Sequence, residues 1–414
     1  MRIAFFTDDY LPYIHGVTTS IQNLRAAYER LGHEVFIIAP KCADYEDNDD
    51  HVIRTNSFNS YIFDKRPVSI VYPGMAKKFD EYEFDVVHSH TQFWMGALGS
   101  MVAKRQGIPH VSTMHTLFTE LLDNYPAAVI SGMIAVSIGY PIAFKTRPVL
   151  PFEFGSLQGL SMDSRDLFKK QAWRLMNTFF AHTSACIAPS EHLFYTMAAH
   201  GLEAPCYVLP NGIDLEQYKA RTDDEHSTST FKKPRGQRWI TAVGRLSGEK
   251  RQRVLVESMA GIADPKVRLI LVGDGPEREN LEELAEELGV ADRIWFTGKQ
   301  SPACVAYILS QSDVFTLASY RFDNQPMVIL EAIASGLPVV YCDDNLKEGL
   351  TAENSILTDT PEPADFAEVF RTLLADRERL KQMSSASRKL SKEFDINRLA
   401  KRMVEIYKDA QPLE

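Results

Sequence analysis

Short apolar runs rich in β-branched and aromatic residues alternate with amphipathic stretches along nearly the whole chain. In the first half the apolar runs predict strands, and amphipathic helices are expected over 18–31 and 190–200. The predicted strands cover residues 3–7, 34–39, 85–88, 109–114, 185–188 and 206–209. This alternation is typical of a parallel sheet with helices on both of its faces.

The same pattern begins again after a polar stretch at 216–237, which predicts a loop or linker. Strands are expected at 238–244, 267–273, 313–318 and 338–341, and a charged helical end begins at 364. The chain is therefore expected to be α/β, with two Rossmann-like, doubly wound parallel-sheet domains over 1–209 and 210–392. Ligands of such sheets bind beyond the carboxyl ends of the strands, so two facing sheets predict a site in the cleft between them.

Composition narrows the class of protein. The 414 residues suffice for two domains, and 55 acidic against 45 basic side chains give a formal net charge of −10. This charge excludes the basic field of a general nucleic-acid-binding protein. The five cysteines lack paired short spacing, which favours reduced thiols over disulfides or a zinc site. The opening residues lack the apolar core of a signal peptide, so we expect a cytoplasmic protein.

One segment departs from an ordinary globular pattern. Residues 124–144 carry no charge, and residues 145–174 carry six basic against three acidic side chains. Prolines and glycines interrupt the uncharged run, which argues against a membrane-spanning helix of about 20 apolar residues. Two interpretations remain open: a buried helix or inter-domain wall, and an interfacial patch. As a patch, 124–174 would hold the protein peripherally on an anionic membrane surface, at the inner face of the cell membrane.

Two loops of the second half join a predicted strand to a helix. The first, GRLSGEK, contains Arg245 and Lys250, which can grip phosphate oxygens where a helix N-terminus adds backbone donors. An exposed loop with ordinary surface charges explains the same residues equally well. The second, VGDGPE at 272–277, lets backbone approach a ligand through two glycines, but a tight turn would also require them.

A third junction, DNQPMVILE at 323–331, carries two carboxylates eight residues apart, about two helical turns. Each can accept two hydroxyl hydrogen bonds, so one is suited to a sugar and the other to a ribose. Asp323 is equally suited to cap a helix. Glu331 lies within an apolar run, so we expect it to be partly buried and paired.

The first half offers two candidates at strand ends. Gly16 lies in the first strand-to-helix loop, where this fold brings backbone near phosphate, and His115 follows a predicted strand. A hydrogen-bonded loop histidine is the alternative for His115. His88 and His90 suggest a metal site, but no carboxylate or cysteine completes it, so we expect none. The acidic run at 44–50 contains an Asp-Asn-Asp triplet, for which a solvated loop is the preferred interpretation.

Taken together, these motifs resemble the family 4 retaining glycosyltransferases of the GT-B fold. The motifs agree in order and spacing along nearly the whole chain. Within the family, the chain most resembles the bacterial membrane-associated enzymes that glycosylate lipids such as diacylglycerol. The motifs are MRIAFFTDDYLPYIHGV, DVVHSHTQF, HT at His115, IAPSE, PNGID, GRLSGEK, VGDGPE, FTGK and LEAIASGLPVV.

The resemblance implies how a nucleotide-sugar donor is held. Arg245 and Lys250 would bind its diphosphate and stabilise the leaving nucleotide in place of a metal ion, so no metal or other cofactor is expected. Glu331 would bind the ribose hydroxyls. Backbone near Met327 and Val328 would approach the phosphate and sugar.

Further roles follow from the same resemblance. Gly16 would line the cleft, and His115 and Asp323 would contact the transferred sugar. Backbone at Gly298 and Lys299 would meet the base. Front-face attack would retain the anomeric configuration, and a C-terminal helix over 393–414 would pack back on the first domain. The implied reaction moves a hexose, with UDP-glucose as donor, to a membrane lipid such as diacylglycerol.

Two residues depart from the family pattern. Asp323 replaces the usual Glu and is one methylene shorter, and Pro326 replaces a common Gly and has no N–H to donate. Both lie on the sugar side of the expected donor site, where they would alter donor choice or weaken catalysis. Transfer to a soluble sugar or metabolite, a nucleotide-sugar epimerase and a non-catalytic nucleotide-sugar-binding protein are the alternatives.

Overall fold

The chain divides into two compact units. A computed structural model describes residues 1–60, 66–72, 74–117, 119, 126–144, 164–219 and 230–412. Unit 1 comprises Met1–Asn211 and Leu399–Glu414, and unit 2 comprises Gly212–Arg398. The C-terminal residues therefore fold with the first half of the chain.

Unit 1 is built on a parallel sheet of seven strands in the order β3-β2-β1-β6-β7-β8-β9. Strands β1, β2 and β8 are buried along nearly their whole length, which explains why they are nearly continuous apolar runs rather than alternating ones. The central strands β6 and β7 are also buried but carry polar residues. The strands are β1 (Arg2–Phe6), β2 (Glu34–Pro40), β3 (Val52–Thr55), β6 (Val86–Ser89), β7 (His110–Thr113), β8 (Ala185–Ala188) and β9 (Cys206–Val208). A separate antiparallel pair joins β4 (Ser57–Ser60) to β5 (Arg66–Ser69).

Helices cover both faces of this sheet. Two clusters of buried side chains join the sheet to helices: one involves α2, and the other involves α4, α5 and α6. On α14, the Tyr407 hydroxyl accepts a hydrogen bond from the Tyr28 hydroxyl of α1 and lies 2.6 Å from Nδ1 of His88 on β6, so the three side chains form a buried network. The helices are α1 (Gly16–Arg30), α2 (Trp94–Gln106), α4 (Pro126–Phe144), α5 (Ser164–Phe180), α6 (Glu191–Ala199) and α14 (Ile396–Asp409), with a 3-10 helix at Met75–Tyr82.

Unit 2 repeats the architecture with six parallel strands in the order β12-β11-β10-β13-β14-β15. Numbered within the unit, this is the order 3-2-1-4-5-6 of a doubly wound nucleotide-binding sheet, with its switch point between β10 and β13. The strands are β10 (Arg238–Val243), β11 (Val267–Val272), β12 (Ile294–Gly298), β13 (Val314–Leu317), β14 (Val339–Tyr341) and β15 (Ser355–Leu357).

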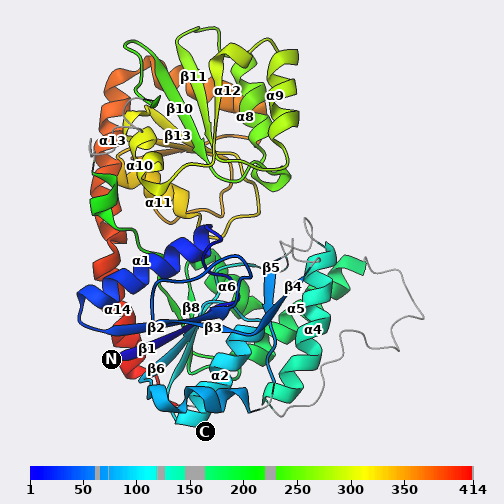
Figure 1. Ribbon diagram of the computed structural model, residues 1–414. Helices are drawn as coiled ribbons and strands as arrows, with labels where there is room; N and C mark the ends of the chain where they lie inside the picture. The colour runs from blue at the N-terminus through cyan, green and yellow to red at the C-terminus, as the bar shows by residue number, and fades with distance from the viewer. Residues whose placement is uncertain are drawn as a thin grey trace. The chain divides into compact units, whose positions relative to one another are not determined.

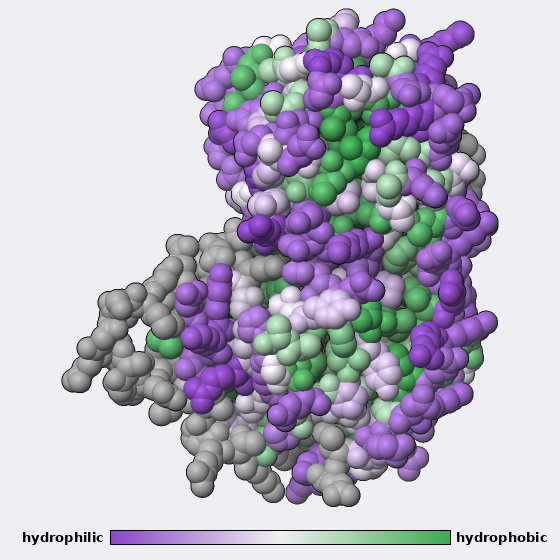
Figure 2. Space-filling view, turned by 180° about the vertical axis from the view of Figure 1, so that it is seen from behind, coloured by the Kyte–Doolittle hydropathy of each residue, from purple (hydrophilic) through white to green (hydrophobic). Residues whose placement is uncertain are grey.

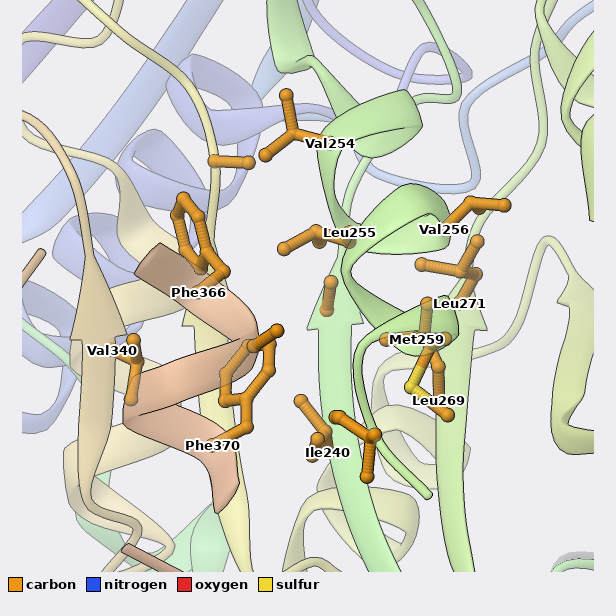
Figure 3. Packing of buried hydrophobic residues seen from close by; sticks show 14 of the residues in the cluster. Ile240, Val254, Leu255, Val256, Met259, Leu269, Leu271, Val340, Phe366 and Phe370 are labelled. Carbon is orange, nitrogen blue, oxygen red and sulfur yellow. The ribbon is translucent and has the colours of Figure 1, made fainter. Parts of the chain in front are cut away.

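The core of unit 2 is divided between the two faces of its sheet. Ile240 on β10 packs toward α8, α9 and α12, together with Phe366 and Phe370 (Figure 3). The next residue, Trp239, belongs to a different cluster, because successive side chains of a strand point to opposite faces. The other face carries α10 and α11 (Figure 1). The helices are α8 (Gln252–Ala260), α9 (Arg278–Glu287), α10 (Pro302–Gln311), α11 (Met327–Ala334), α12 (Pro363–Ala375) and α13 (Arg377–Ser391).

The predicted α/β class with two parallel sheets is confirmed, and every predicted strand is present within a few residues. Prediction from the sequence missed β3, β4, β5, β12 and β15. The last of these has only three residues, and all five residues of β12 are half-buried, so neither is marked by a continuous apolar run.

Hydrophilic residues cover most of the face seen in Figure 2, and hydrophobic residues gather in smaller patches.

Candidate active site

The first candidate group of unit 2 lies in the loop that follows β10. Gly248–Lys250 forms a 3-10 turn that leads into α8, and the side-chain amide of Gln252 donates to the Arg245 carbonyl at 2.8 Å. The Arg245 side chain is exposed, whereas Lys250 is largely covered. The loop therefore presents one exposed guanidinium and one largely covered ammonium at the carboxyl end of the central strand.

The glycines of VGDGPE serve the packing of this loop. The Gly244 and Leu246 amides donate to the carbonyls of Val272 and Asp274 at 2.9 and 3.1 Å. A Cβ on Gly273 would lie 1.9 Å from the Gly244 carbonyl oxygen, and one on Gly275 would lie 2.3 Å from the Leu246 carbonyl oxygen. The two loops meet backbone to backbone, which accounts for these glycines without a ligand.

A third loop continues this edge of the sheet. Gly298 has a left-handed backbone, with φ 72°, and its carbonyl accepts a hydrogen bond from the Gly273 amide at 3.0 Å. Lys299 follows it with an exposed side chain. The loops after β10, β11 and β12 are thus joined at the carboxyl ends of three neighbouring strands.

An ion pair links the Lys250 loop to the loop after β13. The Nζ of Lys250 lies 2.5 Å from Oδ1 of Asp323, and the two side chains are 21% and 12% exposed. The ammonium also lies over the Phe322 ring, 5.2 Å from its centroid. The other carboxylate oxygen of Asp323 is buried and has no hydrogen-bond partner among the described residues. Lys250 and Asp323, which are 73 residues apart in sequence, therefore form one polar group.

The loop that carries Asp323 leads into α11. Pro326 is the residue before the helix, and its carbonyl accepts from the Ile329 amide at 3.0 Å. Met327 is buried and Val328 is half-buried at the first two helical positions. The amides of a first helical turn lack intrahelical acceptors and favour anions, so this end of α11 is suited to phosphate.

Glu331 lies on the next turn of α11, where burial raises the pKa of its carboxyl to about 7. The hydroxyl of Tyr218 donates a hydrogen bond to this carboxylate, which opposes the rise. Its position is partly buried and paired, as expected from the sequence. Nothing in the sequence singled out Tyr218 as its partner.

In unit 1, Gly16 is the first residue of α1 and is exposed. The residue before it, His15, contacts Asp9 with its Nε2 at 2.5 Å from the carboxylate, and Arg66 pairs with the same carboxylate. Asp9 follows β1, so this ion-pair group holds the loop that leads to the start of α1.

His115 lies just beyond β7 and is half-buried. Its Nε2 is 3.1 Å from Nδ1 of His90, and the two rings stack with centroids 5.4 Å apart. Burial lowers the pKa of His115 to about 4, and His15 adds to this by charge repulsion. The imidazole is therefore neutral near pH 7 and can donate or accept one hydrogen bond at each nitrogen.

Asp8 is a further group that the sequence analysis missed. Its carboxylate accepts from the Thr91 hydroxyl at 2.5 Å and from the Met95 amide at 3.1 Å, in the first turn of α2. Burial raises the pKa of Asp8 to about 6 despite these bonds. The signal available was its position directly beyond the first strand, where this fold places ligand contacts.

The structure shows how two carboxylates of the acidic run at 44–50 are paired. The side chain of Asp47 is 10% exposed and pairs with Arg54 at 2.7 Å, and Asp49 pairs with Arg25 at 2.6 Å. Residues 44, 46, 48 and 50 of this loop are exposed, as expected of a solvated loop, but Asp47 and Asp49 are half-buried in these ion pairs. They pair with the half-buried guanidinium groups of Arg54 and Arg25, which the sequence pattern did not connect to them.

No group of three or more His, Cys, Asp or Glu side chains is placed to hold a metal ion within the described ranges. Both ring nitrogens of His88 are engaged elsewhere, 2.6 Å from the Tyr407 hydroxyl and 2.7 Å from the Thr113 hydroxyl. The pair of histidines in HSH thus contributes to a hydrogen-bond network of the protein itself.

The uncharged segment forms one helix, α4, although it contains Gly132, Gly139 and Pro141. The Trp94 ring packs directly on Gly139, where a Cβ would lie 2.3 Å from it. One side of α4 is buried against α2 and α5, but Ile134 and Ile138 are 41% and 62% exposed. Within the described ranges, no helix is both long and apolar enough to cross a membrane. Residues 124–125 and 145–163 of the predicted patch lie outside the described residues.

Comparisons with known proteins agree with this architecture. Residues 14–217 match the model of "Glycosyltransferase Family 4", and residues 223–390 match that of "Glycosyl transferases group 1". An alpha-monoglucosyldiacylglycerol synthase of Streptococcus pneumoniae is 27% identical over 350 residues, which cover 82% of this chain and 70% of the relative. A GDP-mannose-dependent alpha-mannosyltransferase of Mycolicibacterium smegmatis is 26% identical, with 83% and 80% covered.

A solved structure shows the same fold over the full length. The Anabaena protein HepE in complex with UDP superposes with a TM-score of 0.71 at 18% identity, covering 99% of this chain and 100% of that chain. The two parallel sheets, the strand order of unit 2 and the two matched family models lead to one assignment. The chain belongs to the family 4, group 1 glycosyltransferases, which are retaining enzymes of the GT-B fold.

Proposed function

We propose that the protein transfers a hexose, glucose from UDP-glucose, to a membrane lipid such as diacylglycerol, with retention at the anomeric carbon. The observation that carries the donor part is the polar group at the carboxyl end of the sheet of unit 2. There the Lys250–Asp323 pair links the loop after β10 to the loop that leads into α11. Cations and the amides at a helix N-terminus together suit a diphosphate.

We assign the donor contacts accordingly. Arg245 and Lys250 bind the diphosphate, with the backbone of Met327 and Val328 at the start of α11 beside it. Glu331 accepts hydrogen bonds from the ribose hydroxyls, since a carboxylate has lone pairs for both. These assignments require no metal ion, because the two cations stabilise the charge that develops on the leaving phosphate.

Four further contacts are assigned, two in each unit. Backbone at Gly298 and Lys299 meets the base, and Asp323 meets the transferred sugar. In unit 1, we assign His115 to a sugar hydroxyl and the exposed start of α1 at Gly16 to phosphate. In the reaction, the bond from the anomeric carbon to the phosphate oxygen breaks and one to the acceptor hydroxyl oxygen forms. The hydroxyl proton passes to the leaving phosphate.

The proposal of a lipid acceptor is based on the exposed side of α4. Two large apolar side chains on one side of this helix, Ile134 and Ile138, are exposed, and the neighbouring α5 carries Lys169, Lys170 and Arg174. Exposed apolar residues near basic ones suit the surface of an anionic bilayer. The name of the Streptococcus relative, an alpha-monoglucosyldiacylglycerol synthase, supports glucose and diacylglycerol.

A second candidate is transfer of mannose from GDP-mannose, which the name of the Mycolicibacterium relative suggests. Asp323 and Pro326 motivate a third, a protein that binds nucleotide sugars without turnover. These candidates differ in donor and in turnover, so one assay separates them.

The test is to incubate the full chain with a panel of UDP- and GDP-sugars and vesicles of phosphatidylglycerol that contain diacylglycerol. Released nucleoside diphosphate and glycolipid are measured. We expect UDP and an α-glucosyl lipid with UDP-glucose alone, and a loss of at least about a hundredfold in Lys250→Ala. The matched control is Lys266→Ala, an exposed lysine just before β11. Nucleotide binding with no turnover of any donor would overturn the proposal.

A further inference from the structure

The sequence HSH after β6 places two imidazoles in the interior of unit 1. His88 and His90 are 0% and 2% exposed, and their ring centroids lie 4.2 Å apart. The proposed function uses neither of them. Their hydrogen bonds, however, determine where the protons of the histidine cluster reside.

For His88, the direction of the hydrogen bonds is set from outside the cluster. The Tyr28 hydroxyl donates to the Tyr407 oxygen at 3.0 Å, so the Tyr407 hydroxyl is free to donate to Nδ1 of His88 at 2.6 Å. His88 then carries its proton on Nε2 and donates to the Thr113 hydroxyl at 2.7 Å. Both nitrogens of His88 are thereby occupied.

His90 has a different surrounding. Its Nδ1 lies 3.1 Å from Nε2 of His115, and its own Nε2 is buried without a partner among the described residues. A proton on that Nε2 would be an orphaned buried N–H, which is rarer and more costly in proteins than an unpaired acceptor. The favourable neutral form of His90 carries its proton on Nδ1 and donates it to His115.

The consequence falls on His115. Since its Nε2 accepts from His90, its single proton must lie on Nδ1. The ring is half-buried, and its Nδ1 has no hydrogen bond within the described part of the chain. Burial lowers the pKa of both imidazoles, which keeps them neutral and makes the choice of tautomer meaningful.

We propose that His90 is a positioning residue that holds His115 in the Nδ1–H tautomer, so that His115 offers a hydrogen-bond donor to its ligand. A donor of this kind contacts an oxygen lone pair, such as that of a sugar hydroxyl. The identity of the ligand rests on the proposed function, but the tautomer does not.

The test reads the tautomer directly in the full chain labelled with ¹⁵N-histidine, using long-range ¹H–¹⁵N correlation spectra near pH 7. His115→Ala identifies the signal of His115. In the wild type we expect His115 to show a protonated Nδ1 and a bare Nε2. In His90→Phe, which keeps a ring but removes the donor, we expect that preference to be lost. His90→Asn can donate from its amide near the position of Nδ1 and should restore it.

Activity is the second readout. We expect kcat/KM to fall about tenfold in His90→Phe, the effect of one misplaced hydrogen bond, and to recover in His90→Asn. His51→Gln, an exposed histidine next to β3, is the matched control and should change neither readout. Melting temperatures of all variants separate misfolding from a tautomer change.

Two results would overturn the inference: a wild-type His115 protonated on Nε2, or an unchanged His115 spectrum in folded His90→Phe. If the tautomer changes as expected but no donor is turned over, the inference stands and the proposed function fails. If turnover occurs with an unchanged tautomer, the reverse holds.

Discussion

The ammonium of Lys250 lies 2.5 Å from a carboxylate oxygen of Asp323, and the pair is largely covered from solvent. The same lysine is our candidate for binding the donor diphosphate. Without a ligand, Asp323 is the partner of this ammonium. A bound phosphate must therefore compete with the carboxylate of Asp323 for Lys250. The family usually has a Glu at this position. In this chain the shorter Asp323 makes the contact with Lys250.

Removing the charge of Asp323 should strengthen nucleotide binding. In Asp323→Asn the ammonium of Lys250 loses its carboxylate partner, and one negative charge beside the phosphate site disappears. We expect UDP to bind about tenfold more tightly by calorimetry, equivalent to ~1.4 kcal/mol. Asp292→Asn, an exposed aspartate before β12, should leave the affinity unchanged. Weaker binding of UDP in Asp323→Asn would contradict the competition.

Glu331 should make the stability of the protein depend on pH. Its pKa is raised by burial to about 7 in the folded state, above the ordinary 4.5. Between these values the folded state retains a proton that the unfolded state has released, so the contribution of this group to stability falls as pH rises through the window. Above pH 7 the folded protein holds Glu331 as an ionised buried carboxylate, and the whole loss of stability caused by its burial is present.

Glu331→Gln removes this cost and keeps an acceptor for Tyr218. We expect its melting temperature to exceed that of the wild type by about 3 °C at pH 8, with little difference at pH 4.5. Scanning calorimetry without nucleotide measures both. An equal difference at the two pH values would show that ionisation of Glu331 is not the cause.

Gly273 should tolerate no side chain. Its φ of 141° is unfavourable for other residues, and a Cβ would lie 1.9 Å from the Gly244 carbonyl oxygen. We expect Gly273→Ala to destabilise unit 2 by ~2 kcal/mol or more, seen as a lower urea midpoint. Gly248→Ala is the control, because a Cβ there has no atom within 4 Å. Similar midpoints for the two variants would refute the close contact of the loops.

Exposed residues of α4 should mediate binding to vesicles. Ile134 and Ile138 are exposed, so Ile134→Glu with Ile138→Glu should leave the fold intact. We expect co-sedimentation with phosphatidylglycerol vesicles to fall at least about tenfold, since two apolar contacts are lost and two repelling charges are added. Leu357→Glu, an exposed apolar residue of β15 in unit 2, is the matched control. Unchanged binding in the double variant would remove α4 from the membrane contact.

The sequence by itself determined the α/β class and most of the strands. Strands such as β1 and β11 are covered on both faces, so they are apolar at every fully buried position, and that composition can be read without coordinates. It also indicated Glu331 as a partly buried carboxylate, because local apolar neighbours imply burial. Short or half-buried strands such as β15 and β12 carry no such local mark.

Only the tertiary structure decided the partners. Lys250 meets Asp323 across 73 residues, and His90 meets His115 across 25. Asp47, expected in a solvated loop, neutralises Arg54 instead. The periodicity of apolar residues indicates which side of a helix or strand faces the hydrophobic core. It does not indicate which loops the strand order brings together. The pairing of Lys250 with Asp323 and the position of the proton between His90 and His115 follow from how these loops are brought together. They determine the chemistry available at each pair.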